Sequence, residues 1–440
     1  MPHCSLPSRL LSIALAIALA PCALAQGADK PNIILCMADD QGWGDTAYNG
    51  HPLLKTPHLD DMAKNGLRFD RFYAAHPVCT PTRASVMTGR TPNRMGAFKW
   101  GHSLRPQEVT VAEALKKAGY VTGHFGKWHL GSVRIGSPVN PGNSGFDHWL
   151  SAENFFDNDP VLSREGIAVE ITGESSIIAA DAAIEFMKAQ QKAGKPFLAV
   201  VWFGSPHSPF RAAPEDLAQY EGQKNAHWLG EITGLDRAVG KMRAALREMK
   251  IADNTLFWYC SDNGGLQTAS SGGRAKKGSI YEGGIRVPGI IEWPARIKKA
   301  FVHDAPAVTS DIYPTLLDIV GVKIENQPVL DGVSLLPIID GKNVGRDKPI
   351  GFWDHPTGGI STPSDRMMKE LMEAQKNGKP DGGDERLLRK DAGEIKQQYP
   401  EDKFPGHSAW LKYPWKLHRI ESRNGDVKYE LYNLAGDADE

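Results

Sequence analysis

The chain has 440 residues, of which 41% are hydrophobic and 23% charged, so it is long enough to bury the core of one large domain or of a large and a small one. Its 51 basic and 52 acidic side chains leave a formal net charge of −1, and without a basic excess we expect no nucleic-acid partner. The 45 glycines and 30 prolines indicate many tight loops, as in enzymes with elaborate loops at strand ends.

The N-terminus has the pattern of a signal peptide. Arg9 supplies a positive charge, residues 10–20 are apolar, and residues 23–25 read Ala-Leu-Ala, which suits a cleavage site. We therefore predict a signal peptide at residues 1–25 and a secreted or periplasmic protein. The apolar run is too short for a comfortable membrane span, so an uncleaved anchor is the less favoured interpretation. No other stretch predicts a membrane span once the signal is removed.

Removal of the signal peptide leaves three of the five cysteines, namely Cys36, Cys79 and Cys260. So few cysteines in a secreted protein predict that no disulfide framework holds the fold. Cys36 and Cys260 lie in apolar, strand-like stretches, and we predict that both are buried thiols. Cys79 differs from them because it lies in a polar loop.

Strand-like and helix-like segments alternate along most of the chain. The first, Asn32–Ala38, is a continuous apolar run, which is typical of a parallel strand buried on both faces. Thr110 and Glu113 form a capping box at the start of a helix that Gly119 ends. We also predict helices that begin at 57 and cover 181–191 and 228–249, and strands at 120–125, 197–203 and 255–261. This β-α-β alternation predicts an α/β fold in which helices sandwich a large, mainly parallel sheet.

The pattern changes after about residue 341. Residues 364–377 have the spacing of an amphipathic helix, and residues 378–405 are charged and contain Gly and Pro, as in an insertion or surface loop. Two further segments, 415–420 and 427–431, are predicted strands of a short antiparallel sheet. We therefore assign residues 26–340 to the main, catalytic domain and residues 341–440 to an insertion and a small C-terminal subdomain.

Polar side chains follow four of the predicted strands at the point where each strand ends. Because the carboxyl ends of parallel strands meet at one edge of a sheet, we expect these side chains to converge. They are Asp39 and Asp40 after the first strand, Lys127 and His129 after the second, His207 after the third, and Asp262 and Asn263 after the fourth.

The acidic members of this group resemble the ligands of a hard cation. Asp39, Asp40, Asp262 and Asn263 offer oxygen atoms without imidazole or thiolate, a set that suits Ca²⁺ or Mg²⁺ better than zinc. A single aspartate at a strand end is often only a helix cap or a turn residue. The recurrence of acids at two strand ends weakens that simpler interpretation.

Cys79 lies just before a predicted helix at 82–88 that ends at Gly89. The N–H groups and the dipole of a helix N-terminus favour an anion there, and Arg83 is placed to bind an oxyanion. A thiolate nucleophile fits poorly beside an acidic metal site. These residues indicate a metal-assisted hydrolase of an anionic ester, and they leave open whether the ester is a phosphate or a sulfate.

The stretch Cys79-Thr80-Pro81-Thr82-Arg83 resembles the signature of type I, formylglycine-dependent sulfatases, an arylsulfatase-like family of the alkaline phosphatase superfamily. Residues 119–129 resemble the second signature of that family. Four further matching blocks follow the family order between residue 31 and about residue 339: 31–34 with Asp39 and Asp40, 206–210, 261–264, and a last block formed by 277–278 followed by 282–288. Six blocks in order make chance a poor explanation.

The resemblance implies a metal site and a modified residue. Asp39, Asp40, Asp262 and Asn263 should bind Ca²⁺, with Mg²⁺ as the second choice, and the oxidised Cys79 should complete the site. A formylglycine-generating or anaerobic sulfatase-maturating enzyme is the implied partner that converts Cys79 to Cα-formylglycine. One hydroxyl of the hydrated aldehyde would attack sulfur and release the alcohol, and loss of the proton from the second hydroxyl would expel sulfate.

The resemblance also implies roles for the basic residues. Arg83 and Lys127 should stabilise the hydrate, and His129 should accept the proton of its second hydroxyl. His207 should protonate the leaving oxygen, and Lys277 should bind sulfate. His102 and Trp100 are additional candidates for substrate contact, whereas we predict that His124, Trp128 and Trp149 are packing residues.

The resulting prediction is a secreted sulfatase that acts on a sulfated carbohydrate. Two alternatives stay open: a phosphodiesterase or phosphonate monoester hydrolase of the same superfamily, and a non-catalytic protein that binds sulfated glycans. The complete set of candidate catalytic residues argues against the second. Members of the family usually continue past a segment like residues 432–440 into a final helix, so we expect the sequence to be truncated at its C-terminus.

Overall fold

The computed structural model describes residues 1–3, 30–399, 404–437 and 440. Pro31–Glu440 form one structural unit. The predicted signal peptide, apart from its first three residues, lies outside the described part of the chain. Among the described residues, no helix combines the length and apolar character needed to cross a membrane.

The main sheet has ten strands in the order β12-β2-β11-β9-β1-β8-β4-β5-β6-β7. Their bounds are β1 Asn32–Ala38, β2 Leu67–Phe69, β4 Val121–Lys127, β5 His148–Ala152, β6 Val161–Arg164, β7 Ile167–Glu170, β8 Phe197–Trp202, β9 Thr255–Ser261, β11 Gly289–Glu292 and β12 Phe301–His303. The five central strands, from β9 to β5, run parallel, whereas β11, β6 and β7 are antiparallel to their neighbours. Four of the central strands are those predicted from their apolar runs.

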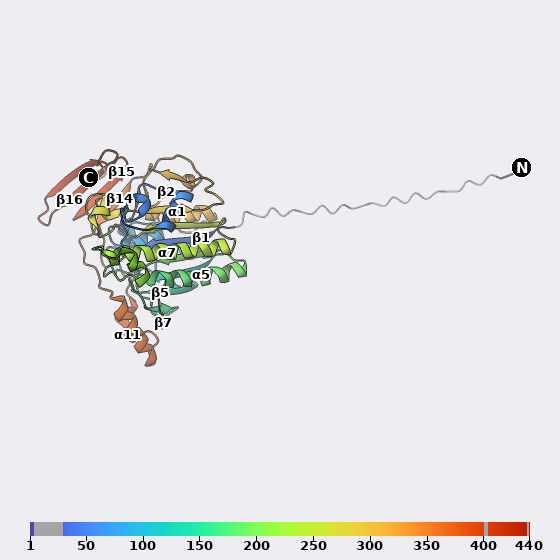
Figure 1. Ribbon diagram of the computed structural model, residues 1–440, viewed down its shortest axis with the longest axis horizontal. Helices are drawn as coiled ribbons and strands as arrows, with labels where there is room; N and C mark the ends of the chain where they lie inside the picture. The colour runs from blue at the N-terminus through green and yellow to red at the C-terminus, as the bar shows by residue number, and fades with distance from the viewer. Residues whose placement is uncertain (4–29, 400–403, 438–439) are drawn as a thin grey trace. The chain divides into compact units, whose positions relative to one another are not determined.

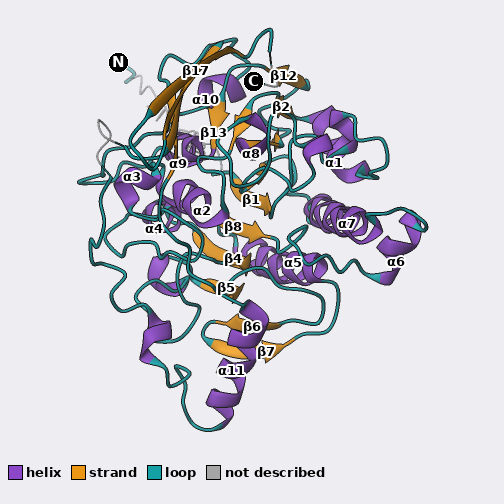
Figure 2. Cartoon of the chain, turned by 90° about the vertical axis from the view of Figure 1, so that its left-hand side faces the viewer, coloured by secondary structure: helices purple, strands orange, loops and turns teal. Residues whose placement is uncertain are grey.

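Side chains alternate along the central strands between two hydrophobic cores. On β1, Ile33, Leu35 and Met37 face one core, and Ile34 and Cys36 face the other. Strands buried on both faces therefore need helices on both faces of the sheet. Figure 2 shows β1, β8, β4 and β5 in succession, with α7 and α5 on one face and α2 and α4 on the other.

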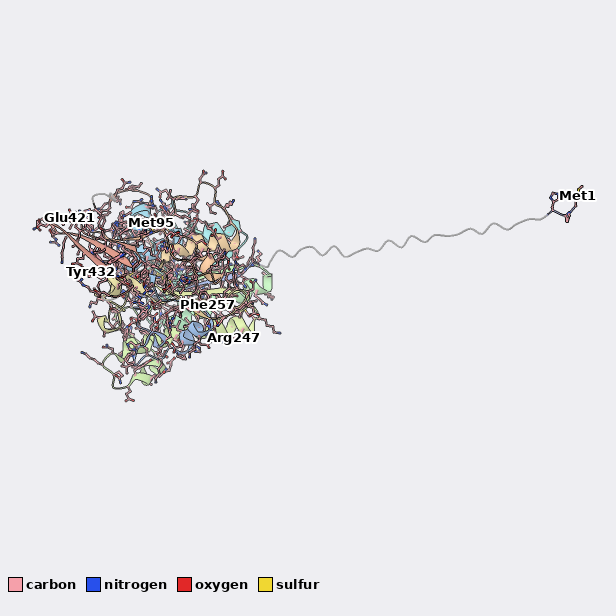
Figure 3. The ribbon with its side chains drawn as sticks, turned by 90° about the horizontal axis from the view of Figure 1, so that it is seen from above. Met1, Met95, Arg247, Phe257, Glu421 and Tyr432 are labelled. Atoms are coloured by element: carbon pink, nitrogen blue, oxygen red, sulfur yellow. The ribbon has the colours of Figure 1, made fainter. Side chains whose placement is uncertain are left out.

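The helices divide between the two cores. One core receives α1 (Pro57–Asn65), α5 (Ser175–Ala193) and α7 (Ala226–Glu248). The other receives α2 (Cys79–Thr88), α3 (Pro92–Met95), α4 (Val111–Lys117), α9 (Ile312–Val320), α10 (Leu336–Ile339) and α11 (Ser364–Lys376). The short helices are α6 (Pro214–Leu217), α8 (Glu282–Ile285) and the 3-10 turns Ala47–Asn49, Gly142–Ser144, Ala218–Tyr220, Thr268–Ser270, Thr309–Asp311 and Glu385–Leu388. Side chains fill the space between these layers (Figure 3).

Two smaller sheets complete the fold. One has the order β10-β3-β13, and the other is an antiparallel sheet with the order β14-β15-β16-β17. Their bounds are β3 Phe72–Tyr73, β10 Arg286–Val287, β13 Ala307–Val308, β14 Ile350–Asp354, β15 His407–Lys412, β16 Trp415–Glu421 and β17 Val427–Asn433. The predicted fold class, a large mainly parallel sheet between helices with a small C-terminal antiparallel sheet, is confirmed.

Helix α11 packs against the main sheet rather than against the C-terminal one. Met368 and Leu371 join a core of the main sheet, and the Gln375 side chain accepts a hydrogen bond from Ala168 N and donates one to Gly166 O. In Figure 1, α11 lies beside β7, away from the sheet formed by β14, β15 and β16. The domain boundary between residues 340 and 341 stays a prediction, and α11 shows that the later segment contributes to the body of the protein.

Local sequence features fix the start of α4 and the end of β4. Thr110 and Glu113 form the predicted capping box at the start of α4. Gly126 on β4 has φ 108°, and a Cβ there would lie 1.9 Å from the carbonyl oxygen of Trp202 on β8. Only glycine permits this close approach, which fixes the end of β4 where Lys127 begins the candidate site.

Candidate active site

Four adjacent parallel strands end at the same edge of the sheet, and each places polar side chains there. The predicted convergence is therefore present in the structure. All of these side chains are buried except His207, which is partly exposed. They are Asp262 and Asn263 after β9, Asp39 and Asp40 after β1, His207 after β8, and Lys127 at the end of β4 with His129 two residues beyond.

Arg83 and Lys127 hold two of the carboxylates from one side. The Arg83 guanidinium donates to Asp262 Oδ2 through Nε at 2.9 Å and Nη2 at 2.7 Å, and its Nη1 donates to the carbonyl of Lys127. Lys127 Nζ donates to Asp39 Oδ2 at 2.7 Å. Burial raises the pKa of Asp39, and the neighbouring Lys127 opposes that rise. The two cations therefore favour the ionised carboxylates in a buried site.

Lys277 and His207 approach the third carboxylate from the other side. Lys277 Nζ lies 2.7 Å from Asp40 Oδ2 and 3.2 Å from His207 Nε2. Burial alone would raise the pKa of Asp40, but Lys277, His207 and Lys127 together lower it. Burial also lowers the pKa of His207 to about 4, with Lys277 adding to the effect and Asp40 opposing it. The neutral imidazole therefore accepts a hydrogen bond from Lys277.

Cys79 is the first residue of α2, and its side chain is buried beside the carboxylates. Asp39, Cys79 and Asp262 each place one potential ligand atom within 4.8 Å of the others. Burial raises the pKa of the Cys79 thiol, although Lys127 and Lys277 oppose this rise. A buried thiol whose pKa is raised does not behave as an activated thiolate, so the geometry gives no support to a cysteine nucleophile.

The donor set fits a hard cation. Asp39 Oδ1 and Asn263 Oδ1 are buried and have no hydrogen-bond partner among the described residues. Buried polar oxygens without a partner are rare, and a cation would satisfy both of them. Asn263 is oriented by its amide nitrogen, which donates to Asp40 Oδ1 at 2.8 Å. Asp39, Asp40, Asp262, Asn263 and residue 79 therefore remain the predicted metal ligands.

His129 is positioned by residues that the sequence analysis did not identify. Its Nε2 lies 3.2 Å from Thr362 Oγ1, which also accepts a hydrogen bond from the Asn154 amide at 3.1 Å. Its carbonyl accepts a hydrogen bond from Thr80 Oγ1 at 2.8 Å, and its Nδ1 is buried without a partner among the described residues. Thr362 lies in an irregular segment between β14 and α11, where no periodic pattern marks a functional residue.

The remaining candidates lie outside this group. Trp100 is 42% exposed, and His102 is partly buried with its Nε2 donating to Gly358 O. In the described part of the chain, no hydrogen bond or ion pair joins either side chain to the residues at the strand ends. The predicted packing residues are buried: His124 contacts Ser151 and the Trp128 ring, and Trp149 belongs to a core of the main sheet.

Comparison with known proteins identifies relatives of this chain. The family model described as Sulfatase matches residues 31–322. The N-acetylgalactosamine-6-sulfatase of Canis lupus familiaris is 33% identical over 370 residues, which is 75% of this chain and 70% of that protein. Arylsulfatase A of Homo sapiens is 33% identical over 379 residues, which is 75% of this chain and 72% of that protein. The solved structure of Ps i-CgsB is similar with a TM-score of 0.76 and 27% identity, covering 93% of this chain and 88% of that one.

The oxygen donor set predicts that Ca²⁺ stabilises the folded protein. Because a ligand that binds only the native state adds RT ln(1 + [L]/Kd), saturation at 100 times Kd should raise the free energy of unfolding by about 2.7 kcal/mol. Thermal unfolding of the chelated protein with and without Ca²⁺ measures this gain. Asp40→Asn and Asn263→Ala should reduce it, because the first removes a negative charge from the predicted ligands and the second removes a ligand oxygen.

Asp45→Asn provides the matched control for this experiment. Asp45 is buried near the same edge of the sheet, but it binds Gly42 N and the Ser270 hydroxyl instead of joining the carboxylate group. This variant should keep its response to Ca²⁺. Stoichiometric zinc in active protein, without calcium or magnesium, would contradict the assignment.

Proposed function

The chain belongs to the sulfatase family, and from this premise we propose that it hydrolyses sulfate esters of a carbohydrate with a Cα-formylglycine made from Cys79 and a bound Ca²⁺. The observation that carries the proposal is the convergence of three buried carboxylates and three cations beside the first residue of α2. Family membership makes the protein a sulfuric ester hydrolase. The carbohydrate substrate is supported by the relative named N-acetylgalactosamine-6-sulfatase.

The proposed groups supply a nucleophile and positive charge. Formylglycine would supply a hydrated aldehyde at residue 79, and Ca²⁺ held by Asp39, Asp40, Asp262, Asn263 and residue 79 would neutralise sulfate oxygens. Residue 79 begins α2, where free N–H groups favour an anion. Lys127 and Lys277 bind Asp39 and Asp40 from different parts of the chain, so a sulfate bound beside these carboxylates would have two ammonium groups near it. Arg83 holds Asp262 and thereby the geometry of the proposed metal site.

The two histidines are held in ways that suit different proton transfers. His207 Nδ1 donates to Ser208 O at 2.6 Å, and its ring stacks on Phe155 with centroids 4.0 Å apart. Its Nε2 is thereby directed toward Lys277 and the carboxylate group, and this nitrogen would carry the proton that His207 delivers to the leaving oxygen. His129 keeps Nδ1 without a partner among the described residues, so this nitrogen is available to accept a proton later in the cycle.

The alternatives from the sequence receive no separate support. Two relatives that are 33% identical to this chain are named N-acetylgalactosamine-6-sulfatase and arylsulfatase A, which favours sulfate over phosphate and phosphonate esters. A non-catalytic role fits poorly with the presence of every candidate catalytic residue at one sheet edge. From the predicted signal peptide we further propose that the protein is exported and that a formylglycine-generating or anaerobic maturating enzyme modifies Cys79.

Maturation should change the mass of the peptide that carries Cys79. Conversion of a thiol to an aldehyde lowers that mass by roughly 18 Da, which mass spectrometry of protein co-expressed with a maturation enzyme can measure. Only the modified protein should hydrolyse nitrophenyl sulfate, and it should prefer this ester to nitrophenyl phosphate. Cys79→Ala is the unmodifiable control. Full activity of the unmodified thiol would refute the formylglycine proposal.

His207→Ala should affect substrates according to their leaving group. Nitrophenolate is stable without a proton, whereas a sugar alkoxide is not, so general-acid help of up to ~10²–10⁴-fold matters for the sugar ester. The variant should lose far more kcat/KM on a sugar sulfate than on nitrophenyl sulfate, because kcat/KM reports steps up to alcohol departure. His129→Ala should instead lower kcat on both esters alike. Equal losses of kcat/KM on both esters for His207→Ala would exclude the leaving-group role.

Thr362→Val should lower kcat by about tenfold and leave kcat/KM nearly unchanged, because His129 would act only after the alcohol has departed. The substitution removes the Thr362 hydroxyl, so His129 Nε2 loses a hydrogen bond that contributes about 1–1.5 kcal/mol. The proposed sulfate-binding residues are unchanged. Steady-state kinetics on nitrophenyl sulfate measure the effect. Thr362→Ser should recover the activity, and Ser361→Ala, at the exposed neighbouring position, is the control. A wild-type kcat for Thr362→Val would show that this contact does not position His129.

A further inference from the structure

We propose that a cavity beside the active site binds a second anionic group of the substrate, a carboxylate or sulfate on a sugar other than the one that carries the cleaved ester. The inference rests on the proposed function and narrows its substrate class to polyanionic saccharides. The cavity has a volume of about 300 Å³, at the lower end of the range for small-ligand sites. Its walls come from two segments, residues 96–105 and 389–397, together with Ile360.

The cavity adjoins the candidate active site through a short chain of contacts. Gly101 N donates to Thr80 Oγ1 at 3.0 Å, and Thr80 follows Cys79 in the chain. The same hydroxyl donates to the carbonyl of His129. One wall of the cavity is therefore hydrogen-bonded to the residue that follows the proposed nucleophile.

Hydrogen bonds tie the first wall segment to the loop around Ile360 and, through Gln107, to the second segment. Ile360 N donates to Trp100 O at 2.9 Å, and His102 Nε2 donates to Gly358 O at 3.1 Å. At the far side, Gln107 Nε2 donates to Gly393 O at 2.7 Å. These contacts give the cavity a defined frame between the two segments. His102, predicted to touch substrate, lines this cavity rather than the group of residues at the strand ends.

Two arginines give the cavity its charge. Arg105 and Arg389 are both partly buried, and within the described ranges neither guanidinium has an ion pair or a hydrogen bond. Arg105 lies over Gly96, which has φ 80° and where a Cβ would come 2.1 Å from the guanidinium carbon, so glycine leaves the room for it. Arg389 follows the turn Glu385–Leu388 with φ 55°, a conformation that is uncommon for a residue with a long side chain.

The other charged residues of the cavity largely compensate one another. Lys396 pairs with Asp391 and lies 3.9 Å from Glu394. The nearby Glu108 is engaged by Arg90, whose Nη1 lies 2.7 Å from Oε1. Arg105 and Arg389 therefore leave the lining with a net positive charge. A planar guanidinium binds a carboxylate or sulfate through two parallel hydrogen bonds, and partial burial strengthens such a bond.

Binding to the Cys79→Ala protein tests the inference without turnover. Isothermal calorimetry compares three tetrasaccharides that each carry a single 6-sulfate, on one terminal N-acetylgalactosamine: one that contains hexuronic acids, its carboxyl-reduced form, and a form with sulfate in place of each carboxylate. Arg105→Gln and Arg389→Gln should each weaken binding of an anionic tetrasaccharide about tenfold, as expected for loss of a charge-assisted hydrogen bond. Both should change binding of the carboxyl-reduced form less than twofold. The anionic tetrasaccharide whose affinity falls more in these variants shows whether the cavity prefers a carboxylate or a sulfate.

Arg386→Gln is the matched control, because Arg386 lies in the same turn, is paired with Asp384, and does not line the cavity. It should bind all three tetrasaccharides as the parent protein does. Equal losses on the anionic and carboxyl-reduced forms, or no preference of the parent protein for the anionic forms, would overturn the inference. Hydrolysis of nitrophenyl sulfate by mature wild-type protein tests the proposed function separately, because that ester has no second anionic group.

Discussion

Three buried carboxylates that share one sheet edge are the constraint on which the site depends. Asp39, Asp40 and Asp262 are each fully or almost fully removed from solvent, and buried ions are strongly unfavourable unless they are paired. Lys127, Lys277 and Arg83 supply one cation for each, at 2.7 Å in every case. Removal of one partner from such a buried pair typically costs about 3–5 kcal/mol, so the site and the stability of the strand ends are coupled.

This balance of charges implies that a bound metal cation would need an anionic substrate to offset its charge. The three acids and three cations are formally neutral as a group. A divalent cation alone would leave an excess of positive charge in a buried site, and a sulfate ester with an ionising nucleophile would offset that excess. The same balance disfavours an isolated thiolate at Cys79, whose pKa burial raises. The electrostatics of the sheet edge are therefore compatible with the proposed chemistry.

The central part of this arrangement was predictable because parallel strands leave a strong sequence signal. Apolar runs such as Asn32–Ala38 mark strands buried on both faces, and the polar residues that follow them must meet at one edge. The C-terminal sheet was only partly predictable. The sequence predicts strands β16 and β17 but not β14 and β15, because β14 has only five residues, one of them glycine, and only Ala409 and Leu411 of β15 are buried. The contact of Thr362 with His129 arises only from tertiary packing across 233 positions of the chain, which no local pattern encodes.

The proposed catalytic residues all lie in the part of the chain that the family model matches, whereas some residues around them lie beyond it. The family model covers residues 31–322, and this range holds every proposed metal ligand and catalytic residue. Thr362, which contacts His129, and Arg389, which lines the cavity beside the site, lie beyond this range, whereas Arg105, the other arginine of the cavity, lies within it. Loops outside a rigid catalytic scaffold can change without disturbing buried charges, whereas any change within the carboxylate group would disturb its balance. The loops after β14 that contribute to the proposed recognition cavity can therefore change without disturbing the buried charges at the strand ends.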